Sequence, residues 1–145
     1  MIDVDVVTLD PGLAPPGYAR DGDAGADLAS RIEVTLAAGG GRALVPTGVA
    51  LALPPGHAGF VLARSGLALH HGVTVLNAPG LIDAGYRDEV KVVLVNTDPA
   101  ADYTVRRGDR VAQLVVQAVE AVRFRPVRAL GSTSRGGGGF GHTGR

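Results

Sequence analysis

Short blocks of apolar residues, separated by turn-forming residues, recur along almost the whole of this 145-residue chain. Residues 32–36 alternate strictly between apolar and polar side chains, which predicts a β-strand with one face in water. Residues 92–95 are instead continuously apolar and rich in valine, which indicates a strand buried on both faces. By the same criteria we expect strands at residues 2–7, 32–36, 43–45, 49–53, 59–62, 73–76, 89–96, 103–105 and 110–119.

Glycine, proline and aspartate cluster between these blocks, at residues 39–41, 54–56, 97–99 and 107–109, where they favour turns. Only one short segment, residues 65–70, suits a helical turn. Strands that recur about every ten residues are typical of a β-sandwich or jelly roll. Since neither an internal repeat nor a linker divides the chain, we expect one all-β domain over residues 1–131.

The last residues, 132–145, differ in composition from the rest, because glycine dominates them. Such a sequence cannot bury enough apolar surface to fold alone, so a frayed terminus is the simplest interpretation. The alternative is a mobile Gly-rich arm whose backbone N–H groups and Arg135 close over an anion. Phe140 favours this alternative, since a lone aromatic ring among glycines has nothing local to pack on and suits a planar ligand.

The most informative segment covers residues 76–90, where turn residues interrupt sequence of β type. It places an amide (Asn77), a carboxylate (Asp83) and an aromatic ring (Tyr86) around two glycines, which allow tight turns and close approach of a ligand. Such a hairpin can hold a flat polar ring against main-chain groups, with a base and an aromatic platform nearby. An ordinary surface turn is the alternative, because the same residue types are common turn formers.

Three further places carry candidate chemistry. Arg64, Ser65 and Gly66 follow a predicted strand and offer a guanidinium fork, a hydroxyl and an open N–H, which suit phosphate oxygens. A capped helical turn with a surface arginine is the simpler interpretation.

Asp27 follows a glycine turn, either as a turn residue or as an acid near a Mg²⁺–phosphate cluster. Gln113 lies in an apolar strand, where its amide needs a hydrogen-bond partner from the protein or from a phosphate.

Composition narrows the classes of function. The formal net charge is zero, which argues against a broad electrostatic grip on nucleic acid. No apolar run is long enough to span a bilayer, and the start of the chain lacks a signal-peptide pattern. Without cysteine the chain has no disulfide framework, thiolate nucleophile or zinc-site spacing, and it has no P-loop motif. We therefore expect a cytoplasmic protein that binds neither membranes nor nucleic acid.

Five segments, taken in order, resemble the five motifs of the trimeric dUTPase family: AGADL (24–28), RSGLA (64–68), NAPGLIDAGYRDEVKV (77–92), RVAQLVV (110–116) and STSRGGGGFGHTG (132–144). The resemblance implies a homotrimeric jelly roll that hydrolyses dUTP to dUMP and pyrophosphate with Mg²⁺, by attack of water on the α-phosphorus. This reaction keeps uracil out of DNA and supplies dUMP for dTMP synthesis. In this family each active site is shared among three subunits.

The same resemblance implies a role for each matching residue. Asp83 would orient and deprotonate the attacking water, and Asp27 would hold Mg²⁺ through its water shell. Asn77 and the hairpin backbone would read uracil, while Tyr86 would pack under the deoxyribose and leave no space for a ribose 2′-hydroxyl. The remaining contacts implied are Arg64, Ser65, Gly66 and Gln113 at the phosphates, Gly80 and Lys91 in the hairpin, Phe140 stacked on uracil, and Arg135 and Thr143 at the γ-phosphate.

Two positions depart from the family pattern. Asp88 stands where a glycine is usual, and His142 stands where a serine is usual, which affects one γ-phosphate contact. The nearest alternative function is dCTP deamination, alone or combined with dUTP hydrolysis, but that family typically has a second serine where Gly66 stands. A non-catalytic nucleotide-sensing module on the same trimer is the other alternative, and the presence of Asp83 argues against it.

Overall fold

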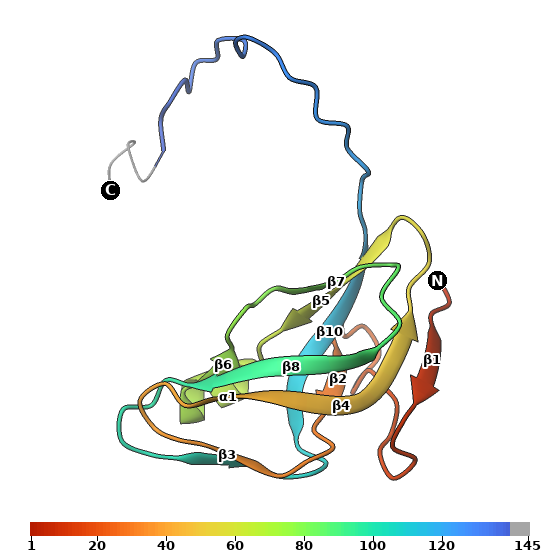
Figure 1. The fold of residues 1–145 in the computed structure, drawn as a ribbon, viewed down its shortest axis with the longest axis vertical. Helices are drawn as coiled ribbons and strands as arrows, with labels where there is room; N and C mark the ends of the chain where they lie inside the picture. Colours follow the sequence, from red (N-terminus) through yellow and green to blue (C-terminus); the bar gives the residue numbers. More distant parts are fainter. Residues whose placement is uncertain (140–145) are drawn as a thin grey trace.

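The secondary structure is almost entirely β, in a computed structural model that describes residues 1–139 (Figure 1). A short helix, α1 (Ser65–His71), lies between the fifth and sixth strands. The strands are β1 (Asp5–Thr8), β2 (Ala26–Ala29), β3 (Val34–Leu36), β4 (Arg42–Ala52), β5 (His57–Leu62), β6 (Val73–Val75), β7 (Gly80–Ile82), β8 (Glu89–Asn96), β9 (Tyr103–Val105) and β10 (Arg110–Ala118).

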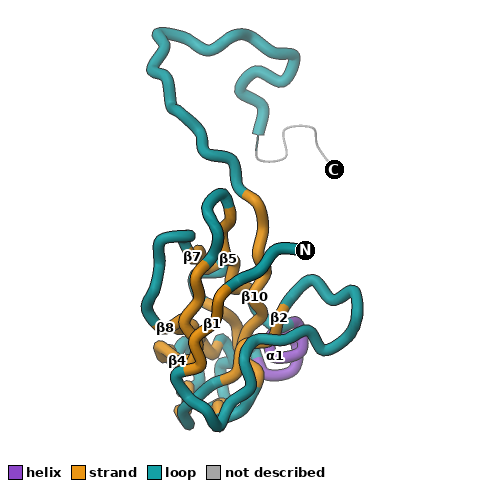
Figure 2. The backbone as a smooth tube through the Cα atoms, turned by 90° about the vertical axis from the view of Figure 1, so that its right-hand side faces the viewer, coloured by secondary structure: helices purple, strands orange, loops and turns teal. Residues whose placement is uncertain are grey.

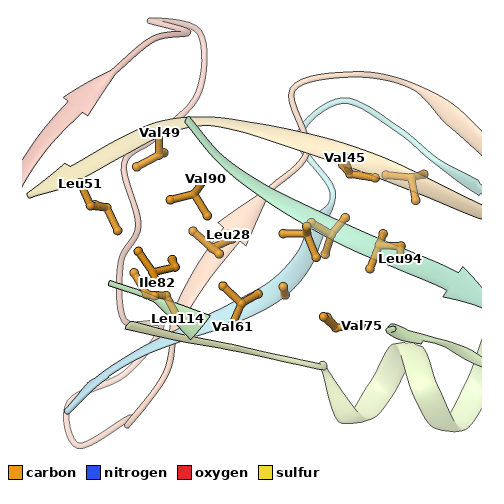
Figure 3. Packing of buried hydrophobic residues seen from close by; sticks show 14 of the residues in the cluster. Leu28, Val45, Val49, Leu51, Val61, Val75, Ile82, Val90, Leu94 and Leu114 are labelled. Atoms are coloured by element: carbon orange, nitrogen blue, oxygen red, sulfur yellow. The ribbon is translucent and has the colours of Figure 1, made fainter. Parts of the chain in front are cut away.

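Two four-stranded antiparallel sheets face each other across the core (Figures 1 and 3). Their strand orders are β1-β4-β8-β6 and β2-β10-β5-β7, and β3 pairs with β9 in a smaller ribbon. No two neighbouring strands in either sheet are consecutive in the chain, as in a jelly roll. The all-β jelly roll expected from the sequence is confirmed.

Aliphatic side chains from both sheets fill the space between them (Figure 3). Val45 and Leu94 reach it from one sheet and Leu28 and Val61 from the other, and none of the four is more than 4% exposed. Burial alternates along β2, so that Leu28 points into the core while Asp27 points to the opposite face. The side chain of Asp27 therefore lies on the outer face of the sheet β2-β10-β5-β7, away from the core.

Strand β4 is continuous where the sequence predicts two strands. Residues 43–45 and 49–53 both fall in or beside β4, and a register shift between Pro46 and Ala50 interrupts its pairing with β8. Gly48 lies in this bulge with φ of 73°, a left-handed conformation that glycine adopts without strain. The break in the apolar pattern therefore marks a bulge and not a turn.

Strands β2 and β7 are not predicted from the sequence. Asp27 interrupts the apolar pattern of β2, and Gly80 begins β7, so neither segment is a typical block of strand residues. Both form because a longer partner strand supplies the pairing, β10 for β2 and β5 for β7. Strand β1 (Asp5–Thr8) also begins later than the predicted residues 2–7, and all its residues are exposed.

Helix α1 confirms the predicted helical turn. Gly72 ends it in a left-handed conformation with φ of 63°, and its N–H donates to the Ala68 carbonyl. At the other end Arg64 occupies the N-cap position in an extended conformation, and Ser65 and Gly66 are exposed. Neither α1 nor any other helix within residues 1–139 has the length and apolar character needed to cross a membrane.

Beyond β10 the chain leaves the sandwich. Residues 119–139 contain no strand or helix and extend away from both sheets (Figures 1 and 2). The Val119 N–H donates to the Gly56 carbonyl at 2.8 Å. Further along, the side chains of Phe124 and Leu130 are 91% and 88% exposed. This segment therefore adds nothing to the core of its own chain.

Candidate active site

The turn between β7 and β8 holds several of the candidate residues. The Tyr86 N–H donates to the Asp83 carbonyl at 3.0 Å, which closes a tight turn. The Arg87 guanidinium donates to the carbonyls of Ala84 at 2.6 Å and of Tyr86 at 2.8 Å. At the exit of the turn the Tyr86 hydroxyl donates to the Glu89 carbonyl at 2.8 Å. Hydrogen bonds thus hold the turn at both ends.

Asp83, Tyr86 and Lys91 line one cleft of about 250 Å³, which is completed by Leu81, Ile82 and Val90. The Asp83 carboxylate is exposed, and Tyr86 is 39% exposed. The Lys91 ammonium lies 3.9 Å from the carboxylate of Asp88, the residue that departs from the family pattern. A base, an aromatic face and a cation therefore surround a single hollow.

Asn77 lies just before β7, the strand that leads into this hollow. Gly80 is buried, and a Cβ added to it would lie 3.4 Å from both the Asn77 amide nitrogen and the Val61 Cβ. The Asn77 side chain therefore rests directly over the backbone of Gly80. This arrangement presents amide and main-chain groups side by side, as the recognition of a flat polar ring requires.

A second group of candidates lies on the opposite edge of the same sheet. The register of β2 with β10 pairs Asp27 with Gln113. The two oxygens of Asp27 lie 3.3 Å from Arg64 Nε and 3.0 Å from Arg110 Nη1. Arg64 also donates to the Arg110 carbonyl at 2.8 Å. Because two guanidinium groups share one carboxylate, this arginine group keeps a net positive charge that suits phosphate.

The glycine turn before β2 makes room for Gln113. A Cβ added to Gly25 would lie 3.1 Å from the Gln113 Cβ and 3.3 Å from its amide nitrogen, tighter than ordinary contact. Glycine is therefore the residue that lets the Gln113 amide lie beside Asp27. The structure brings Gln113, Asp27 and Arg64 together, although they are far apart in the sequence.

Asp27 is the candidate metal contact. Its Oδ1 atom is buried and accepts no hydrogen bond from the residues that the structure describes. Within residues 1–139 no group of three His, Asp or Glu side chains gathers as a metal-chelating cluster. Because Oδ1 is ion-paired with Arg64 but accepts no hydrogen bond, it fits contact with a hydrated cation through a water of its shell, and not direct chelation.

Arg110 is a site residue that the sequence analysis missed, although it begins the RVAQLVV segment. It lies between two further clefts. One, of about 360 Å³, is lined by Asp27 and by residues 12–15 and 17–19. The other, of about 280 Å³, is lined by Arg64, Leu67, Tyr103, Gly108, Asp109 and Arg110.

Burial raises the pKa of the Tyr103 hydroxyl and the charge of Asp109 raises it further, so this hydroxyl stays neutral at physiological pH.

The hairpin cleft and the arginine group lie far apart within one chain. β2 and β7 are the outer strands of the sheet β2-β10-β5-β7, so three inter-strand spacings, about 14 Å, separate them. Gln113, the partner of Asp27, pairs with Leu62 of β5, whereas Asp83 lies beyond Ile82, which pairs with Gly59. This register adds about 13 Å along the strands. One copy of the chain does not bring Asp83 to the arginines.

A family model described as dUTPase matches residues 13–144 of this chain. The chain belongs to the dUTPase family. The deoxyuridine 5′-triphosphate nucleotidohydrolase of Thermobifida fusca is 57% identical over 141 residues, which cover 97% of this chain and 78% of the relative. The corresponding enzyme of Streptomyces coelicolor is 54% identical over 143 residues, which cover 99% of this chain and 78% of that one.

Solved dUTPase structures share this fold. The dUTPase of Staphylococcus bacteriophage 80alpha with dUpNHpp has a TM-score of 0.91 and 24% identity, and the match covers 100% of both chains. A mutant dUTPase from phage phi11, whose structure describes the coordination of a structural Mg(II) ion, has a TM-score of 0.82 and 24% identity, and covers 90% of this chain and 100% of that one. At these identities the likeness establishes the fold.

The residues that the dUTPase motifs predicted divide by their place in the fold. Asn77, Gly80, Asp83, Tyr86 and Lys91 gather at the hairpin, and Asp27, Arg64 and Gln113 gather at the arginine group, with Ser65 and Gly66 at the start of α1. Arg135 belongs to residues 119–139, which contain no strand or helix, and its Nε donates to the Gly138 carbonyl at 2.9 Å. Phe140, Thr143 and the departing His142 lie outside the described residues.

Proposed function

We propose that this chain hydrolyses dUTP to dUMP and pyrophosphate. The observation that carries the proposal is the hairpin cleft, where Asp83 lies beside Tyr86 on a turn closed by hydrogen bonds. Such a turn fixes the backbone that carries the Asp83 carboxylate before substrate arrives, which favours general-base catalysis. Membership of the dUTPase family supports the same reaction.

The reaction needs a base and a means of neutralising charge. The water oxygen forms a bond to the α-phosphorus, and the bond from that phosphorus to the bridging oxygen of the β-phosphate breaks, which releases pyrophosphate. Asp83 accepts the proton of the attacking water, a contribution of about 10²–10⁴-fold in rate. Arg64 and Arg110 offset the negative charge of the phosphates, with Ser65, Gly66 and Gln113 as further donors.

Recognition of the nucleoside belongs to the hairpin. The Asn77 amide and the backbone around Gly80 contact the uracil ring, because the amide lies beside the Gly80 backbone. Tyr86 packs under the deoxyribose, where its ring leaves no space for a 2′-hydroxyl. Lys91 lines the same cleft and contacts the substrate there.

The buried Oδ1 atom of Asp27, which accepts no hydrogen bond from the described residues, supports a role for this residue in holding Mg²⁺ through water. When bound, Mg²⁺ neutralises charge on the phosphates. Arg64 and Arg110 keep the Asp27 carboxylate in one orientation, because each pairs with one of its oxygens.

We also propose that the active enzyme is a homotrimer with shared sites. The separation of the hairpin cleft from the arginine group within one chain supports this assembly, because substrate must contact both. One copy then supplies Asp83 and Tyr86, and a neighbour supplies Asp27, Arg64 and Gln113. We propose further that residues 132–145 act as an arm, through which Arg135, Phe140 and Thr143 complete the site.

The test is pyrophosphate release from dUTP, dCTP, dTTP and UTP in the presence of Mg²⁺. Rapid release from dUTP alone is the expected result, because the hairpin selects both uracil and deoxyribose. Equal release from all four nucleotides contradicts recognition by the hairpin. Conversion of dCTP with release of ammonia supports the deaminase alternative, and binding of dUTP without release supports a sensor. The cytoplasmic location stays a prediction from the sequence.

A further inference from the structure

The bulge in β4 leaves a gap in the hydrogen-bond ladder next to the hairpin. Pro46 pairs with Lys91 and Ala50 pairs with Glu89, so residues 47–49 of β4 lie opposite Val90 alone. A bulge of this kind removes regular ladder partners from backbone groups on both strands. In a buried position each of those groups needs another partner.

Side chains supply the missing partners. The Gly48 N–H donates to Glu89 Oε1 at 2.8 Å, and the Thr47 hydroxyl donates to the Val90 carbonyl at 2.7 Å. The Arg31 guanidinium donates to the same Glu89 oxygen at 3.1 Å. Glu89 is only 8% exposed, and burying a carboxylate is costly unless it is paired in this way. The Glu89 side chain is therefore fixed between β4 and Arg31.

The backbone of Glu89 is in turn the support of Tyr86. Its carbonyl accepts the hydrogen bond of the Tyr86 hydroxyl at 2.8 Å, and its N–H donates to the Asp88 carboxylate at 2.7 Å. We propose that Glu89 is a positioning residue, whose buried carboxylate sets the place of Tyr86 against the deoxyribose and so the discrimination between dUTP and UTP. The inference rests on the proposed function and adds to it a determinant of sugar specificity outside the cleft lining.

The length of the Glu89 side chain matters because it fixes where the start of β8, and with it the Tyr86 ring, lies. The Tyr86 ring excludes a 2′-hydroxyl only while its face stays in place, and a displacement of about 1 Å in an active site suffices to change rates by about a hundredfold. When the Glu89 side-chain oxygen is drawn back, the start of β8 loses the hydrogen bonds that Gly48 and Arg31 donate to it, and the acceptor for the Tyr86 hydroxyl shifts with it.

The experiment compares Glu89→Asp and Glu89→Gln in the full-length protein, with kcat and KM measured for dUTP and for UTP. Glutamine keeps an oxygen at the same distance for Gly48 and Arg31, so it should retain the wild-type preference for dUTP within about threefold. Aspartate pulls the carboxylate back by one methylene, so it should lower that preference at least about tenfold. This loss of preference should appear as a rise in the ratio of kcat/KM for UTP to kcat/KM for dUTP.

A matched control separates positioning from a general loss of stability. Val105 of β9 is fully buried at 0% exposure in the separate β3-β9 ribbon, so Val105→Ala should lower the Tm without changing the ratio of kcat/KM for the two nucleotides. An unchanged ratio in Glu89→Asp, or an equal change in Val105→Ala at similar loss of Tm, overturns the inference. A wild-type protein that does not prefer dUTP overturns the proposed function instead.

Discussion

The Nε atom of Arg64 lies 3.3 Å from the Oδ1 atom of Asp27, and this ion pair joins the start of α1 to the middle of β2. Asp27 thereby holds the guanidinium of Arg64 at the surface of the second sheet before any phosphate binds. Because Arg110 shares the same carboxylate, the pair does not cancel the positive charge of the group. A phosphate can therefore bind to arginines that are already oriented, at little cost in side-chain entropy.

Mixing two inactive variants tests whether each site draws on two copies of the chain. We expect Asp83→Asn and Arg64→Ala to be inactive separately, because one lacks the base and the other a phosphate contact. In trimers assembled at random from equal amounts of both, about a quarter of the sites should combine an intact Asp83 with an intact Arg64 and recover activity. A mixture of Asp83→Asn with Asp83→Ala is the control and should stay inactive, and failure of the first mixture to recover activity contradicts shared sites.

The variant Asp83→Asn should bind dUTP but turn it over at least about a hundredfold more slowly, because the amide cannot accept the proton of the attacking water. Stopped-flow measurement of pyrophosphate release gives the rate, and calorimetry with dUpNHpp gives the affinity. The Asp83 side chain is exposed, so its substitution should leave the Tm unchanged. Undiminished turnover would remove Asp83 from the mechanism.

Deletion of residues 132–145 should leave a folded protein with weaker catalysis. Residues 132–139 make only local hydrogen bonds, such as the one from the Gly136 N–H to the Thr133 carbonyl, so the thermal unfolding curve should not move. Loss of the arm should reduce kcat/KM for dUTP at least about tenfold, because a closing segment excludes water and completes the site. The point variant Phe140→Ala is the matched comparison. Full activity of the truncated chain contradicts a role of the arm.

Acid should weaken one link between the loop after β1 and the turn before β10. The Arg107 guanidinium, hydrogen-bonded to Asp10 at 2.8 Å, is the main reason that the pKa of this carboxyl lies below its ordinary value. Since the folded pKa is the lower one, the stabilisation is complete above the unfolded pKa of about 3.9 and is lost as the pH falls through the folded value.

The measurement is the Tm of the wild type and of Asp10→Asn from pH 7 to pH 2.5. The wild type should be the more stable at neutral pH, and the difference between the two should shrink below about pH 4. Asp21→Asn, which changes an exposed acid of the same loop, should show no such trend. A difference that stays constant over the whole range contradicts the ion-pair explanation.

The sequence predicted most strands of the jelly roll because their pattern is local. Residues 32–36 alternate in burial as their polarity predicts, and residues 89–96 form a mostly buried central strand. The helical turn at α1 was also predictable, since a glycine C-cap follows it. The motifs, and with them the dUTPase family and the residues of the hairpin, could be identified for the same reason, because each motif occupies a few consecutive positions.

Tertiary structure alone decided which of these segments meet. Strands β2 and β7 form only because β10 and β5 pair with them, and the bulge at Gly48 is a property of the β4–β8 register. Arg110 joins Asp27 only through pairing of strands that lie far apart in the chain, and the Glu89 carboxylate meets the Gly48 N–H only where β4 and β8 pair. The residue types that identify the chemistry stand at neighbouring positions of each motif. The pairing of distant strands instead follows from burial of the two sheets against each other, which no local pattern encodes.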